Sequence, residues 1–173
     1  MKLAYLVRGL PGHPLHPPLT DATIGAYTAA SALAVLAAAG VSEENLTKAW
    51  WLVLLVGLAV TGPTALTGLA DWLGISRGTP LWRTATVHMA SMLVATGFFA
   101  LTAVFSHDRY VNGEMTTRAL VGTLLGYGFL TLGGWLGGSV VFVHGMRVLN
   151  LVDEPARRAA APGGPEKEEA EGA

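Results

Sequence analysis

Four histidines and two aspartates are the side chains of this sequence best suited to chemistry: His13, His16, His88, His144, Asp21 and Asp71. Neutral imidazole and carboxylate groups are ligands of Zn, Fe and Mn, and imidazole is also an axial ligand of haem iron. The chain has no cysteine, which excludes disulfides, thiolate metal sites, cysteine-ligated iron–sulfur clusters and covalently attached c-type haem. Any metal or redox chemistry must therefore use nitrogen and oxygen ligands.

Long uncharged stretches indicate that a membrane arranges these side chains. Charge-free windows lie at 22–41, 49–70, 84–106 and 119–146, and a helix needs roughly 20 mostly apolar residues to cross the hydrocarbon. The composition agrees, since 51% of the residues are hydrophobic and 13% are charged. We expect an all-α integral membrane protein, an antiparallel four-helix bundle with helices at about 20–41, 49–72, 81–106 and 118–149.

The predicted domain organisation has three parts. Residues 1–19 form a lead-in rich in proline and glycine, residues 20–152 form the transmembrane domain, and residues 153–173 form a tail of Ala, Pro, Gly and Glu. We expect this tail to be disordered, because its composition buries too little apolar surface. Pro17 and Pro18 suit the first turn of the first helix, where no amide hydrogen bond is lost.

The distribution of Lys and Arg predicts the orientation in the membrane. Threading four helices up and down places the six polar side chains at one end of the bundle and His107 at the other. The first end also receives most of the basic residues: Lys2, Arg8, Arg77, Arg83, Arg147, Arg157, Arg158 and Lys167. The opposite end receives Lys48, Arg109 and Arg118. By the positive-inside rule, the end with the histidine cluster and both termini face the cytoplasm, which places the protein in the cytoplasmic membrane.

Two cofactor arrangements fit this cluster. In the first, His88 and His144 lie on separate helices at matching depth, which is the arrangement that axial ligation of haem b requires. The glycine run at 133–138 would let a porphyrin approach the backbone, with Gly134 and Gly138 at the cofactor. Glycines at this spacing are also typical of close helix packing, so both interpretations of the run stay open.

In the second arrangement, the same side chains bind a transition metal ion such as Fe, Zn or Mn directly. The ligands would be His13, His16, His88 and His144 with Asp71 or Asp21. Asp71 could instead fix the tautomer of a histidine ligand. The residue before each proline is pushed toward extended geometry, so the segment 13–17 could fold over the bundle mouth. Roles as interfacial anchors, helix ends or lipid contacts stay open for each of these residues.

Several motifs resemble a bacterial membrane-protein family, the domain of unknown function numbered 2231. The motifs are HPLHP at 13–17, LTD at 19–21, GLADW at 68–72, GGWLGG at 133–138 and HG at 144–145. The resemblance covers roughly residues 12–148. It implies four membrane helices. Members of this family sometimes occur fused to Rieske-type iron–sulfur domains, which implies a Rieske-type protein as a candidate redox partner.

The sequence thus predicts a small membrane protein whose histidine and aspartate cluster binds haem b or a transition metal and passes electrons. The alternatives are a non-redox accessory or scaffold protein of a membrane complex, and a small transporter that acts as a homo-oligomer. The sequence has no GxSxG, HExxH or phosphate-loop motif to indicate a hydrolase. It has no basic stripe that would indicate nucleic-acid binding. The long apolar stretches predict the lipid bilayer as the surroundings.

Overall fold

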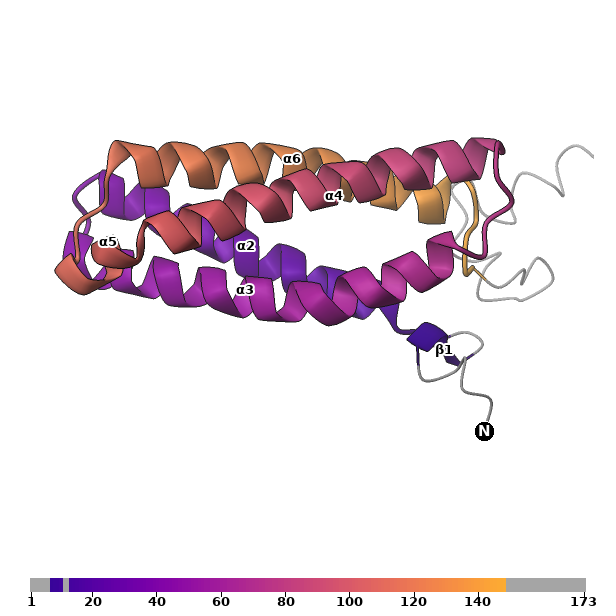
Figure 1. Cartoon of the computed structure of the whole chain (residues 1–173), viewed down its shortest axis with the longest axis horizontal. Helices are drawn as coiled ribbons and strands as arrows, with labels where there is room; N and C mark the ends of the chain where they lie inside the picture. Colours follow the sequence, from indigo (N-terminus) through magenta and orange to yellow (C-terminus); the bar gives the residue numbers. More distant parts are fainter. Residues whose placement is uncertain (1–6, 11–12, 149–173) are drawn as a thin grey trace, which may run out of the picture.

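The computed structural model describes residues 7–10 and 13–148. This part of the chain forms a small hairpin followed by long helices (Figure 1). Strand β1 (Gly9–Leu10) pairs antiparallel with β2 (His13–Pro14). The long helices are α2 (His16–Ala38), α3 (Glu43–Trp72), α4 (Pro80–Phe105) and α6 (Thr117–Phe142), and the short helix α5 (His107–Asn112) precedes α6.

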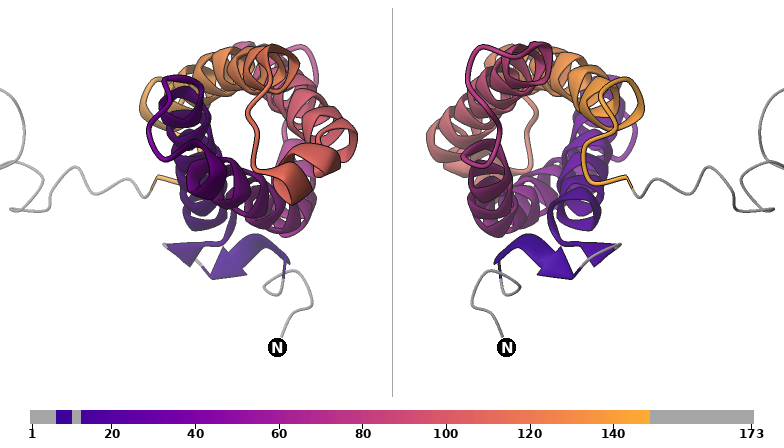
Figure 2. Two further views of the ribbon diagram at one scale, coloured as in Figure 1. Left: turned by 90° about the vertical axis from the view of Figure 1, so that its left-hand side faces the viewer. Right: turned by 90° about the vertical axis from the view of Figure 1, so that its right-hand side faces the viewer.

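The long helices form the predicted four-helix membrane architecture. Each of the four is long and apolar enough to cross a bilayer. In the end views they close into a ring (Figure 2). Their outer surfaces expose large apolar side chains such as Leu66, Val104 and Phe142. Lipid can cover such a surface, because every backbone polar group within a helix is already satisfied internally.

The bundle consists of two helical hairpins, α2–α3 and α4–α6, whose helices pack closely within each hairpin and less extensively between them. Figure 1 shows α3 and α4 diverging toward the end that carries β1. At the centre, the buried rings of Tyr27 and Phe99 stack across the two hairpins with their centres 4.0 Å apart. Gly57 and Gly126 lie behind these rings, where an added Cβ would come within 3 Å of a ring carbon. This aromatic stack is one of the contacts that join the two hairpins.

The first two helices begin earlier than predicted, and α2 also ends earlier, at Ala38 rather than at 41. Helix α2 begins at His16 rather than at 20, and Pro17 and Pro18 occupy its first turn as expected. Helix α3 begins at residue 43 rather than at 49, because Glu44 and Lys48 pair one turn apart and continue the helix beyond its apolar span. A search for charge-free windows misses such charged helix ends.

The last predicted helix is shorter than expected. Helix α6 ends at Phe142 rather than at 149, because Gly145 and Arg147 adopt positive φ angles that a helix cannot contain. The segment 107–112, between the predicted third and fourth helices, forms α5 at the opposite end of the bundle (Figure 1). There Trp51 stacks on Tyr110 with the ring centres 4.8 Å apart. The predicted tail at 153–173 lies outside the described residues, as do residues 1–6 and 11–12 of the lead-in.

Candidate functional site

His16, at the start of α2, is held by groups of α3. Its Nδ1 lies 3.0 Å from the backbone oxygen of Thr64 and 3.3 Å from Oγ1 of Thr67. Gly68 lies directly behind the ring, because a Cβ at this position would come within 2.6 Å of the imidazole Cε1. A backbone carbonyl only accepts hydrogen bonds, so Nδ1 carries the proton and Nε2 carries the lone pair.

His88, in the third turn of α4, repeats this arrangement in the other hairpin. Its Nδ1 lies 2.7 Å from the backbone oxygen of Gly133 on α6. Gly137 lies behind the ring, where a Cβ would come within 3.0 Å of the imidazole Cε1. His88 therefore also donates through Nδ1 and keeps the lone pair on Nε2.

The two histidines occupy equivalent places in the two hairpins. The same sequence spacing separates His16 from Tyr27 and His88 from Phe99. In each hairpin, the imidazole bonds to a carbonyl one turn before the glycine behind it, Gly68 or Gly137. The aromatic rings likewise rest on the equivalent glycines of the second helix. The bundle thus combines two hairpins of similar construction, each of which contributes one histidine.

The two imidazoles lie near each other in an edge-to-face arrangement. Their ring centres lie 6.5 Å apart and their planes are inclined by 78°. Metal–nitrogen bonds of about 2.0–2.1 Å place the ring centres of two imidazoles on opposite sides of one ion roughly 6 Å apart. Histidine ligands of metals almost always donate their other ring N–H to a carbonyl, a carboxylate or water. The pair formed by His16 and His88, here called the histidine pair, has both features.

His144 and Asp71 lie at the same end of the bundle with other partners. Nε2 of His144 lies 3.0 Å from Oγ1 of Thr84 on α4. Asp71, in the last turn of α3, is 7% exposed and forms an ion pair with Arg147. The sequence had indicated Asp71 as a metal ligand or a histidine partner, and it had assigned no partner to Arg147. The charge of Asp71 is therefore balanced by a guanidinium group.

His13 and Asp21 do not join the histidine pair. His13 is exposed in β2, and the β-hairpin lies beside the ring of helices rather than across its mouth (Figure 2). Asp21 is exposed in the second turn of α2. Within residues 7–10 and 13–148, no group of three or more His, Asp or Glu side chains is placed to hold a metal ion. The six predicted ligands thus separate into the histidine pair, the region around Asp71 and two exposed positions.

The glycines of α6 fall into two groups. Gly133 and Gly137 face α4, where an added Cβ would overlap Met92 or His88. Gly134 faces α2, with Cδ1 of Ile24 at 3.7 Å from the position of an added Cβ, and at Gly138 no described atom lies within 4 Å of that position. Gly133 and Gly137 thus serve close helix packing, Gly134 lies in ordinary contact with α2, and only Gly138 of these four has open space beside it among the described residues.

Four apolar helices with a polar cluster at one end define a polytopic integral membrane protein. Residues 12–150 match the family described as "Predicted membrane protein (DUF2231)". The chain belongs to this family, as its motifs predicted. It has no significant match among curated proteins or among solved structures.

Proposed function

We propose that this protein binds haem b between His16 and His88. The observation that supports the proposal is the histidine pair, with its ring centres 6.5 Å apart and each Nδ1 on a backbone carbonyl of its own hairpin. Haem iron needs at most two axial ligands from the protein. A metal ion without a porphyrin needs three or four protein ligands, and the described residues contain no such group. The donor set therefore favours haem over a bare ion.

The arrangement of the hairpins supports the same choice. The α2–α3 and α4–α6 hairpins contact each other less than the helices within each hairpin do. His16 belongs to one hairpin and His88 to the other, so each hairpin would contribute one imidazole to a haem bound here. The open space beside Gly138 of α6 lies at the same end of the bundle.

His88 stays one of the two proposed haem ligands, and His16 takes the place of His144 as the other. The sequence paired His88 with His144, whereas the ring of His88 lies 6.5 Å from that of His16. A threonine hydroxyl lies near Nε2 of both candidates, at 3.0 Å in His144 (Thr84) and at the longer distance of 3.5 Å in His16 (Thr20). Bound haem would supply a one-electron carrier at the membrane edge. We therefore propose membrane electron transfer as the function, with a Rieske-type protein as the candidate redox partner. The same pair could instead contribute two ligands to an Fe, Zn or Mn ion, which the test below separates from haem.

Absorption spectra of the detergent-purified protein, oxidised and dithionite-reduced, test this proposal. The cells that express it are supplied with a haem precursor, and elemental analysis of the same sample detects other metals. We expect a sharp reduced α-band from low-spin haem b. His16→Ala and His88→Ala should each abolish it, because a two-ligand site cannot lose one ligand and stay low-spin. His107→Ala, at the opposite end of the bundle, is the matched control and should keep the band.

The remaining outcomes are equally definite. A band that persists in both His16→Ala and His88→Ala rejects the histidine pair. A band lost in His144→Ala and retained in His16→Ala restores the pairing predicted from the sequence. A flat spectrum with stoichiometric metal rejects haem and supports direct metal binding. A flat spectrum without metal rejects both and favours the scaffold or transporter alternatives.

We also propose that the end with the histidine pair faces the cytoplasm, with the protein in the cytoplasmic membrane. Among the described residues, this end carries four arginines: Arg8, Arg77, Arg83 and Arg147. The end with α5 carries Lys48, Arg109 and Arg118, and Glu44, Asp108 and Glu114 pair with two of these three groups. The larger number of basic residues at the first end, four against three among the described residues, supports a cytoplasmic position for it, because the positive-inside rule counts Lys and Arg near the spans.

A further inference from the structure

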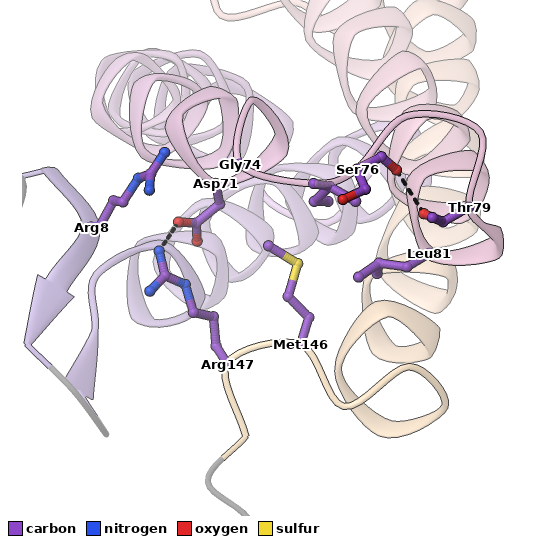
Figure 3. A pocket seen from close by; sticks show the side chains of 9 residues that line it. Arg8, Asp71, Gly74, Ser76, Thr79, Leu81, Met146 and Arg147 are labelled. Carbon is purple, nitrogen blue, oxygen red and sulfur yellow. Dashed lines mark hydrogen bonds and ion pairs between the residues drawn. The ribbon is translucent and has the colours of Figure 1, made fainter.

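A pocket of about 450 Å³ lies at the end of the bundle that carries the histidine pair. It is bounded by the end of α3, the loop that follows it, the start of α4 and the segment after α6 (Figure 3). Binding pockets for small molecules typically measure about 300–1,000 Å³. The pocket is therefore large enough for an organic headgroup and much larger than a single inorganic ion.

Two arginines from distant parts of the chain converge on this pocket. Arg8, directly before β1, donates to the backbone oxygen of Ala70 at 2.7 Å. Arg147 pairs with the carboxylate of Asp71. Figure 3 shows the two guanidinium groups on either side of Asp71. Each guanidinium has five N–H donors, so these contacts leave donors on both. Two guanidinium groups against one carboxylate give the pocket one net positive charge.

The backbone conformation after α6 determines the position of Arg147. Arg147 adopts φ 63°, a left-handed conformation that is uncommon for residues other than glycine, and Gly145 two residues earlier adopts φ 67°. These two residues turn the chain after α6 back toward α3. The turn brings the guanidinium of Arg147 to the pocket.

The rest of the lining changes from polar to apolar. Ser76 and Thr79 contribute hydroxyl groups from the loop between α3 and α4. Leu81 and Met146 contribute an apolar wall beside them. Arginine binds phosphate through paired N–H donors, and a pocket with a polar and an apolar side at the end of membrane helices suits the headgroup region of a phospholipid.

We propose that this pocket binds a phosphate group through Arg8 and Arg147. A lipid headgroup and a free phosphate ion share this chemistry, and the pocket volume and its apolar wall favour the lipid. The proposal is independent of the histidine pair and of any cofactor there. Asp71 competes with the phosphate for Arg147, so its carboxylate sets how tightly the anion binds.

Native mass spectrometry of the detergent-purified full chain, titrated with phosphatidylglycerol or phosphatidylcholine, measures this binding. We expect Arg8→Gln to weaken phosphatidylglycerol binding about tenfold or more, because the substitution removes charge-assisted hydrogen bonds to the phosphate. Asp71→Asn should strengthen it several-fold, because Arg147 loses its competing partner. Arg83→Gln is the matched control, since Arg83 is exposed at the same end and does not line the pocket. Circular dichroism establishes that each variant is folded.

The opposite signs expected for Arg8→Gln and Asp71→Asn make the test specific. Equal affinities in the wild type and all three variants, or a loss in Arg83→Gln equal to that in Arg8→Gln, would overturn the proposal. Inorganic phosphate is titrated in parallel. If it binds with the same dependence on Arg8 and Asp71, the phosphate site is supported with the free ion as its source. If only phosphatidylglycerol shows this dependence, the lipid is the source.

Discussion

At the residue scale, two glycines determine where the imidazoles of the histidine pair can lie. Gly68 and Gly137 each leave the space that a Cβ would fill, and the ring of His16 or His88 occupies it. A larger residue would push the ring away from the carbonyl that binds its Nδ1. In these two places, the absence of a side chain on one helix fixes the side chain of another.

Gly68→Ala should therefore destabilise the protein. The new Cβ would lie 2.6 Å from Cε1 of His16, so the ring must move and its hydrogen bond to Thr64 weakens. Overpacking of this kind costs about 1–3 kcal/mol. Unfolding in mixed detergent micelles measures the change. Gly97→Ala is the control, because no described atom lies within 4 Å of its added Cβ, and replacing a helical glycine by alanine stabilises by about 0.5–1 kcal/mol. Equal effects of the two substitutions would contradict this account.

At the element scale, buried polar contacts join helices both between the two hairpins and within one of them. The indole Nε1 of Trp50 on α3 donates to Oγ1 of Thr123 on α6 at 3.1 Å, and both side chains are fully buried. Within the first hairpin, Thr23 and Thr64 share a hydrogen bond of 2.9 Å. Such bonds fix helix rotation, because an unpaired polar group inside the membrane is costly.

Thr123→Val should remove the acceptor for Trp50 while keeping the shape of the side chain. We expect a loss of about 1 kcal/mol in the free energy of unfolding, within the range measured for hydrogen bonds between membrane helices. Thr131→Val is the matched control. Thr131 is exposed on the same helix and bonds to the backbone oxygen of Tyr127. If the two variants unfold alike, the contact between α3 and α6 does not contribute to stability.

At the scale of the whole molecule, the two ends of the bundle differ in chemistry. One end holds the histidine pair, the ion pair of Asp71 and Arg147, and the pocket beside it. The other end holds α5, whose Tyr110 and His107 pack on Trp51 as an aromatic cluster. Aromatic rings of this kind are typical of membrane interfaces. The molecule is thus polarised along its long axis.

Cysteine labelling should establish which end faces the cytoplasm. The natural chain has no cysteine, so Ser76→Cys and Asn112→Cys each create a single reactive thiol. These exposed residues lie in the loop after α3 and at the end of α5. In intact spheroplasts, a membrane-impermeant maleimide should label Asn112→Cys and leave Ser76→Cys unlabelled until the cells are broken. The reverse pattern would place the histidine pair on the outer side.

The sequence predicts which residues lie at each end of the bundle, because span length and apolar composition are local properties that do not depend on packing. The four spans, their antiparallel order and the opposite position of His107 were predicted this way, and the helices confirm them. The family was predicted from the motifs, and the family match confirms it. The start of α3 and the end of α6 were placed less well. Charged residues can continue a helix, and positive φ angles can end one, within stretches whose composition changes little.

The sequence by itself determined which side chains reach the same end of the membrane, and only the tertiary structure decided which of them meet. His16 lies near His88 because each helix is rotated until its histidine bonds to a carbonyl and rests on a glycine of its own hairpin. That rotation depends on contacts between helices distant in sequence. Arg147 reaches Asp71 through a turn after α6 for the same reason. The depth of a residue in the bilayer depends on its own helix, whereas the side chains that it contacts depend on how the helices pack.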